Sequence, residues 1–268
     1  MISLVSLLVA AALVCLQSGY QAYAQIEGKN DLRDNLQPNI IPMPKKRALR
    51  PFINIAGPPP ESARLIPGTL LELSCEVIGF PAPTAQWLKN GEPLTEFDDV
   101  NEIMNIHPTS LARLTSKMIV SSAANGDVYT CVATSGVKQQ MASTTVVTVA
   151  GNDEESLFGL EALFRKPSKP IITEYYNEVF QEIGTSILLP CKHFSTSPSQ
   201  VYWFDGDEKP VFGNPRMRIL PTGDLLIPSL HWDDMGNYSC TVKNAYGKDT
   251  VETFLYPNKK QFFLVTVN

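Results

Sequence analysis

The chain contains 268 residues, of which 44% are hydrophobic and 18% are charged, and its formal net charge at pH 7 is −5. This length is expected to hold one or two domains. The mild acidity gives no reason to expect a nucleic acid partner.

The N-terminal residues predict secretion. An apolar run at residues 4–16 is followed by the small-x-small sequence Ala22-Tyr23-Ala24, which is typical of a cleaved signal peptide at residues 1–24. The run is short for a membrane-spanning helix, and no later segment is long enough to span a membrane. We therefore expect a secreted, extracellular protein without a membrane span.

Residues 25–50 are rich in Asn, Pro and charged residues and have no sustained periodicity, so they are predicted to form a flexible leader. The basic run Lys45-Lys46-Arg47 in this leader is interpreted as a solvated stretch or as a processing or glycosaminoglycan site. The first strand is expected near residues 52–55.

Two later regions, residues 51–150 and 167–258, repeat one pattern of Cys, Trp and Tyr. In each region a Trp lies twelve positions after the first Cys, and a Tyr lies two positions before the second Cys. The residues are Cys75, Trp87, Tyr129 and Cys131 in the first region, and Cys191, Trp203, Tyr238 and Cys240 in the second. This spacing is the signature of the immunoglobulin fold. We therefore predict an all-β protein with two tandem, I-set-like sandwiches.

The four cysteines by themselves allow three pairings. The Trp and Tyr spacing selects the disulfides Cys75–Cys131 and Cys191–Cys240, and it predicts that both Trp and both Tyr residues are structural core residues. Such disulfides require an oxidising compartment, which agrees with secretion. The fifth cysteine, Cys15, lies within the predicted signal peptide.

The strand before each first cysteine is nearly a copy of its counterpart. Residues 68–75 and 184–191 both begin with Gly-Thr and alternate so that Leu73 and Leu189 point inward. Pro190 cannot donate a ladder hydrogen bond, so we expect an edge or a bulge there. The second region has the corner sequence D-x-G-x-Y-x-C at 234–240, whereas the first region has Asn-Gly-Asp at 125–127, which predicts a looser corner.

Residues 151–166 are predicted to form a linker, which begins polar and then becomes apolar. The spacing of its large apolar residues is typical of a short amphipathic helix. They either pack between the two domains or form part of a partner-binding surface. These residues are Leu157, Phe158, Leu160, Leu163 and Phe164.

Sequence motifs for catalysis or metal binding are absent. The three histidines lack zinc-binding spacing, and the chain contains no G-x-S-x-G, P-loop, G-x-G-x-x-G or C-x-x-C motif. The acidic pairs match no calcium-binding loop and are typical of turns. We therefore expect no enzymatic activity, no cofactor and no metal. One sequon, Asn237-Tyr238-Ser239, makes Asn237 a candidate N-glycosylation site with an outward side chain.

The last strand of the second region is a candidate for partner binding. If Val251, Thr253 and Leu255 face the core, then Phe254 and Tyr256 face outward. Two outward aromatic rings on one strand are typical of an interface hot spot. The alternative is that the linker or the first domain covers them. Residues 259–268 are expected to form a C-terminal tail.

The second region resembles the insect imaginal morphogenesis protein-Late family, whose members are also called neural/ectodermal development factors. Three segments carry this resemblance: Gly-Asp-Leu-Leu-Ile at 223–227, Trp-x-Asp-Met-Gly-Asn-Tyr-x-Cys at 232–240, and Gly-Lys-Asp-Thr continuing to Thr-Phe-Leu-Tyr-Pro at 247–257. The resemblance implies a secreted protein that sequesters insulin-like peptides and antagonises insulin and insulin-like growth factor signalling, with roles in growth, metabolism and neural development. It assigns no individual hormone contacts. The alternative is a cell-adhesion or axon-guidance module that binds itself or a cell-surface immunoglobulin protein.

Overall fold

The computed structural model describes residues 47–66, 69–94, 108–148, 168–259 and 264–265, and within these ranges the regular structure consists of β-strands and one 3-10 helix. The alternation of apolar and polar residues seen in the sequence appears as alternating burial along the strands. In β4 (Leu71–Phe80), for example, Leu73, Cys75 and Val77 are buried while Glu72 and Ser74 are exposed. The all-β prediction is confirmed.

The first sandwich has two sheets, and their strands pair antiparallel except for the parallel pair of β3 and β9. The first sheet contains β2 (Phe52–Gly57), β4 and β7 (Leu111–Val120), which pair in the order β2-β4-β7. The other is a five-stranded sheet of β3 (Ser62–Leu65), β9 (Lys138–Thr148), β8 (Val128–Ser135), β5 (Thr84–Lys89) and β6 (Glu92–Pro93).

The second sandwich follows the same plan. The first of its sheets contains β13 (Gln200–Phe204), β16 (Gly236–Asn244), β17 (Gly247–Asn258) and β10 (Ile171–Glu182), with β12 (Lys192–Phe194) paired to β10. The second is a three-stranded sheet of β11 (Ile187–Leu189), β15 (Leu225–Ile227) and β14 (Arg218–Ile219). The 3-10 helix η1 (Trp232–Asp234) leads into β16. Separately, β1 (Arg47–Ala48) pairs with β18 (Leu264–Val265).

Each sandwich is closed by one disulfide, Cys75–Cys131 or Cys191–Cys240, so both predicted pairings are confirmed. The predicted core aromatics lie beside them and are almost completely buried: Trp87 is 5% exposed and Trp203 is 1% exposed. The Trp87 Nε1–H donates to Ser116 Oγ at 3.1 Å, and the Trp203 Nε1–H donates to the Gly223 carbonyl at 2.9 Å. Tyr129 and Tyr238 are each 3% exposed.

Pro190 marks a change of sheet. Strand β11 ends at Leu189 and pairs with β15, and the chain resumes as β12, which pairs with β10 in the other sheet. Pro190 therefore lies between two strands, where the backbone does not have to donate a ladder hydrogen bond, so its lack of an N–H has no cost. The following Cys191 N–H donates to the buried Asp224 Oδ1 at 3.0 Å.

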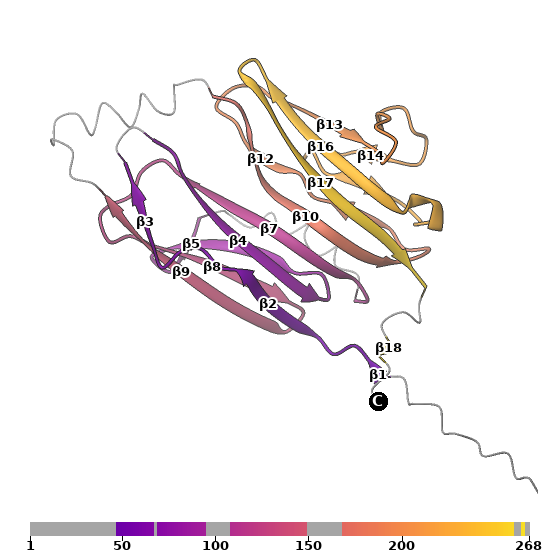
Figure 1. The fold of residues 1–268 in the computed structure, drawn as a ribbon, viewed down its shortest axis with the longest axis horizontal. Helices are drawn as coiled ribbons and strands as arrows, with labels where there is room; N and C mark the ends of the chain where they lie inside the picture. Colours follow the sequence, from indigo (N-terminus) through magenta and orange to yellow (C-terminus); the bar gives the residue numbers. More distant parts are fainter. Residues whose placement is uncertain (1–46, 67–68, 95–107, 149–167, 260–263, 266–268) are drawn as a thin grey trace, which may run out of the picture. The chain divides into compact units, whose positions relative to one another are not determined.

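The two sandwiches share one sheet. An eight-stranded sheet runs in the order β13-β16-β17-β10-β7-β4-β2, with β12 attached to β10, so that β10 of the second sandwich pairs antiparallel with β7 of the first (Figure 1). In an ordinary immunoglobulin sandwich, strand D borders strand E at this edge. Here β7 is strand E and β10 contains strand A of the next domain. The sequence pattern did not predict this pairing.

A β-bulge at Asn177 adjusts the junction between β7 and β10. Thr115 Oγ1 donates to Asn177 Oδ1 at 2.8 Å, and the buried Thr253 Oγ1 donates to the Tyr176 carbonyl at 2.6 Å. These bonds satisfy polar groups that the irregular ladder cannot pair. The junction is also apolar, because Ala112 and Leu114 of β7 belong to one buried cluster with residues of the second sandwich, including Ile172, Val179 and Leu255.

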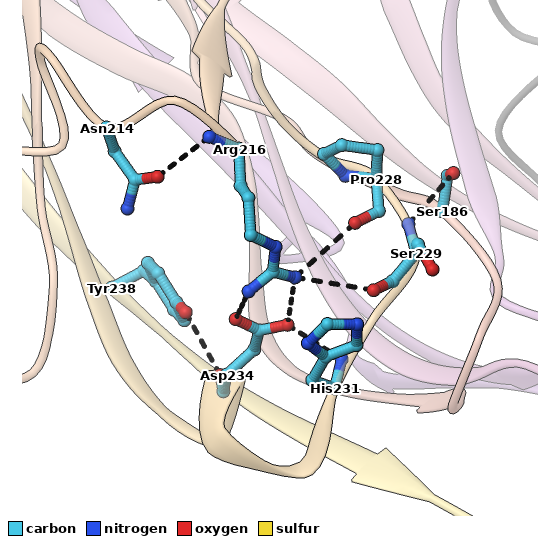
Figure 2. Close-up of polar contacts among 8 residues, drawn as sticks. All are labelled: Ser186, Asn214, Arg216, Pro228, Ser229, His231, Asp234 and Tyr238. Carbon is cyan, nitrogen blue, oxygen red and sulfur yellow. Dashed lines mark hydrogen bonds and ion pairs between the residues drawn. The ribbon is translucent and has the colours of Figure 1, made fainter.

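The corner at residues 234–240, where η1 leads into β16, is held by the buried carboxylate of Asp234 (Figure 2). Asp234 is 4% exposed and accepts two bonds from the Arg216 guanidinium, at 2.9 and 2.8 Å, and a third from the His231 N–H at 2.7 Å. Burial opposes the charged form, but these bonds keep the pKa of Asp234 below its ordinary value. Tyr238 Oη donates to the Asp234 carbonyl at 3.0 Å.

The first sandwich builds its corner differently. Tyr129 Oη donates to the Ser122 carbonyl over a longer distance, 3.4 Å, as expected for a looser corner. Asp127 nevertheless adds bonds of its own: it accepts from Asn90 Nδ2 at 2.9 Å, from Lys89 Nζ at 2.9 Å and from the Ala124 N–H at 2.8 Å. These contacts, with that from Asn90 the largest, lower the pKa of Asp127 from 3.8 to about 2.

The Asp127 contacts predict a pH-dependent contribution to stability. A carboxylate whose pKa is lowered by folding stabilises the fold above its unfolded pKa, and this contribution is lost as the pH falls through the folded pKa. We expect Asp127→Asn to be less stable than the natural chain at pH 7. The difference in urea midpoint should shrink as the pH falls from about 4 to about 2. The exposed Glu92→Gln variant is the control, and an Asp127→Asn difference that stays constant over this range would contradict the assignment.

Candidate partner-binding face

The structure places the predicted hot-spot pair on β17. Phe254 is 38% exposed, whereas its neighbours Thr253 and Leu255 are fully buried, so Phe254 points away from the core. Tyr256 is half-buried, and its ring lies 5.5 Å from that of Phe180 and 5.8 Å from that of Trp232. The apolar linker residues 157, 158, 160, 163 and 164 lie outside the described residues.

The strand registers extend this face across both sandwiches. Residues that pair directly across neighbouring strands share a face of the sheet. One row of such pairs crosses β16, β17, β10, β7, β4 and β2 in order: Asn237, Phe254, Glu178, Arg113, Ile78 and Asn54. Their chain neighbours Leu255, Val179, Ala112 and Val77 are buried in the core, so this row lies on the outer side of the sheet.

A second row on the same side is mainly apolar. Tyr256 pairs with Phe180, and Phe180 pairs with Leu111, while Phe52 pairs with Phe80 at the far edge. Most of these side chains are half-buried, and Phe80 is 7% exposed. We use the term outer-face band for those apolar residues of the two rows that are at least partly exposed: Phe52, Ile78, Leu111, Phe180, Phe254 and Tyr256.

Charge at the centre of the outer-face band is paired within the sheet. Arg113 contacts Glu76 at 2.6 Å and Glu178 at 3.1 Å, so one side chain links β4, β7 and β10. The hydrogen bond to Glu76, followed by that to Glu178, raises the pKa of Arg113. Because all three groups are partly exposed to water, their contribution to stability is small. One guanidinium and two carboxylates leave one net negative charge at this position.

Sequence reasoning found one end of the outer-face band and missed the rest. Alternation within residues 178–182 could have identified Phe180 as outward-facing, as it did for Phe254 and Tyr256. Phe52, Ile78 and Leu111 lie in another sandwich, and only the β7–β10 pairing brings them onto the same face. No local pattern encodes that pairing.

The remaining candidates for chemistry are the histidine and acidic side chains. Among the described residues, no group of three or more His, Cys, Asp or Glu side chains is arranged to hold a metal ion. His193 Nε2 bonds to Ser199 Oγ at 2.9 Å, and His231 belongs to the Asp234 corner (Figure 2). In the part of the chain that the structure describes, no helix has the length and apolarity to cross a membrane.

Comparison with known proteins agrees with this architecture. The immunoglobulin I-set domain model matches residues 55–149 and 170–256. The neural/ectodermal development factor IMP-L2 of Drosophila melanogaster is 30% identical over 236 residues, which cover 87% of this chain and 86% of that protein. The zwei Ig domain protein zig-4 of Caenorhabditis elegans is 30% identical over 76% of this chain and 79% of that protein.

The solved structures include a crystal structure of the neural ectodermal development factor IMP-L2. It matches with a TM-score of 0.66 and 26% identity, and it covers 81% of this chain and 100% of that chain. Sequence, fold and coverage thus point to one group of proteins. The chain belongs to the IMP-L2 family of neural/ectodermal development factors, built from two immunoglobulin I-set domains.

Proposed function

We propose that this protein binds an insulin-like peptide through the outer-face band and thereby withholds the hormone from its receptor. The resemblance to the IMP-L2 family suggests the ligand class. The single observation that carries the proposal is the outer-face band, whose outward apolar side chains run from Phe254 and Tyr256 on β17 to Phe52 on β2 and so cross both sandwiches. Binding of this kind needs no catalysis and no cofactor.

The dimensions of the band suit a helix. Neighbouring strands are about 4.8 Å apart, so the four spacings from β17 to β2 span about 19 Å. A helix rises 1.5 Å per residue, and a segment of about 12 residues therefore covers about 18 Å. An insulin-like peptide presents an apolar helical surface to its receptor. Such a helix could lie across the strands and bury its apolar side against the band.

The residues of this face can also supply the binding energy that a stable complex needs. A standard protein interface buries about 800 Å² per partner, and most of its binding energy comes from a few aromatic or Arg residues near the centre. Phe180, Phe254 and Arg113 are residues of this kind, and Arg113 already has its charge paired in the free protein. A ligand therefore does not have to bury an unpaired guanidinium at this position.

Secretion forms part of the proposal. Two disulfides fit an oxidising compartment, and we assign residues 1–24 to a signal peptide. We further assign residues 25–50 to a leader, 51–150 and 167–258 to the two domains, 151–166 to a linker and 259–268 to a tail. Restraint of insulin-like signalling would account for roles in growth, metabolism and neural development.

Substitution of Phe254 tests the proposed face. Phe254→Ser should weaken binding of the best-bound peptide from an insulin-like panel by more than about tenfold, because it removes an exposed aromatic contact of the band. Isothermal titration calorimetry measures this affinity. Met141→Ser is the matched control, since Met141 is 62% exposed on β9 and lies off the band. Unchanged affinity in folded Phe254→Ser protein would remove this residue from the site.

The same protein preparation tests the adhesion alternative. A hormone binder should remain monomeric in sedimentation and form a one-to-one complex with the peptide. An adhesion module should self-associate, or bind cells in the absence of hormone. Self-association without peptide binding would overturn the hormone proposal.

A further inference from the structure

The sequon Asn237-Tyr238-Ser239 lies at the start of β16, on the same side of the sheet as the outer-face band. Asn237 is exposed and Ser239 is half-buried, whereas Tyr238 between them is 3% exposed. The acceptor amide and the hydroxyl that complete the sequon therefore face outward together. Strand position, rather than the three-letter motif alone, makes Asn237 compatible with a glycan in the folded chain.

The position of Asn237 relative to the band is fixed by register. Asn237 pairs directly with Phe254 across β16 and β17. Directly opposite residues have Cβ atoms about 5 Å apart. A group attached to Asn237 Nδ2 would therefore stand beside the Phe254 ring, at the end of the band that belongs to the second sandwich.

We propose that Asn237 carries an N-linked glycan in a fraction of the secreted molecules and that this glycan covers the Phe254 end of the outer-face band. An N-linked glycan is bulky and hydrophilic. It would prevent an apolar partner from approaching Phe254, so the occupied form would bind an insulin-like peptide more weakly than the unoccupied form. The effect on hormone binding rests on the function proposed above.

The chemistry of the modification is conventional. Asn237 Nδ2 forms a bond to the anomeric carbon of an oligosaccharide donated by a polyprenyl pyrophosphate. The bond from that carbon to the pyrophosphate breaks, the polyprenyl pyrophosphate leaves, and Nδ2 gives up one proton. The proposal thus requires a lipid-linked sugar donor of the secretory pathway and no other reactant.

Partial occupancy follows from the location of the sequon. In the folded protein Asn237 and Ser239 lie within the β16–β17 ladder, and Cys240 is bonded to Cys191. An acceptor held in a central strand beside a disulfide is not accessible to a transferase, so transfer must precede pairing of β16 with its neighbours. Folding and glycosylation therefore compete for this segment. The outcome of that competition sets the proportion of each form.

The test compares four forms of the full chain secreted from eukaryotic cells: the natural chain, Ser239→Thr, Ser239→Ala and Asn237→Gln. Intact mass before and after enzymatic glycan removal measures occupancy, and lectin chromatography separates the two fractions. We expect Ser239→Thr to raise occupancy and the other two variants to abolish it. Absence of any glycan from Ser239→Thr protein would overturn the proposal.

Two readouts then separate this inference from the hormone assignment. Carbene labelling of Phe254 should fall by more than about half in the occupied fraction, because the glycan stands over the ring. Peptide affinity should be lower by more than about tenfold in the same fraction and should return on glycan removal. Equal Phe254 labelling in both fractions would overturn the inference. Shielded Phe254 together with no peptide binding by either fraction would support the glycan position and overturn the proposed function.

Discussion

Leu114→Ala should destabilise both sandwiches together, by about 3 kcal/mol. Leu114 lies on β7 of the first sandwich and is 2% exposed, and its buried cluster includes Ile172, Val179 and Leu255 of the second. Removing its side chain leaves a cavity at the β7–β10 junction, where the closely packed core cannot easily collapse. Calorimetric unfolding should show one transition, shifted to lower temperature.

Leu111→Ser on the same strand is the matched control for Leu114→Ala. Leu111 is half-buried and belongs to the outer-face band, so its loss should cost much less stability but should weaken peptide binding. Comparison of the two variants thus distinguishes the role of the core side of β7 in stability from the role of its outer side in binding. Two independent unfolding transitions, with only the first domain affected by Leu114→Ala, would contradict a shared core.

Asp234→Ala should destabilise the second sandwich by about 2 to 3 kcal/mol. The substitution leaves the Arg216 guanidinium and the His231 N–H without their carboxylate acceptor in a largely buried corner. The expected loss is smaller than is usual for a buried pair, because the Arg216 side chain is 37% exposed and water can partly replace the carboxylate. Urea denaturation followed by circular dichroism measures the change.

The control for Asp234→Ala is Asp207→Asn. Asp207 pairs with Lys209 at 2.9 Å, but both side chains are at least 70% exposed, so this substitution should not measurably change the urea midpoint. If Asp234→Ala were as mild as Asp207→Asn, the Arg216–Asp234 contact would not be a structural requirement of the corner.

Local sequence patterns predicted the features that depend on local chemistry. The spacing of Cys75, Trp87 and Cys131 is set by how one sandwich closes, so the disulfides and the buried Trp residues could be read directly. For Pro190, which lacks an N–H, the sequence predicted an edge or a bulge, and the structure instead places this residue between two strands that belong to different sheets. The outward position of Phe254 followed from alternation with Thr253 and Leu255.

The pairing of β7 with β10 could not be predicted in this way. Alternation states which face a residue occupies but not which strand lies beside it. The two strands are separated by β8, β9 and the linker, and their register depends on a bulge at Asn177 whose side chain bonds to Thr115. Phe180, Leu111 and Ile78 therefore appeared unrelated in the sequence, although they line one face in the structure.

Side-chain footprinting of the hormone complex tests the central claim most directly, namely that one apolar face spanning both sandwiches binds the hormone. Carbene labelling of the protein with and without a bound insulin-like peptide should show protection at both ends of the outer-face band, at Phe254 and at Phe52 or Ile78. Labelling of Phe212, which is 88% exposed and lies off the band, should stay unchanged. Protection confined to one sandwich, or equal labelling of the band in the free and bound protein, would contradict the account.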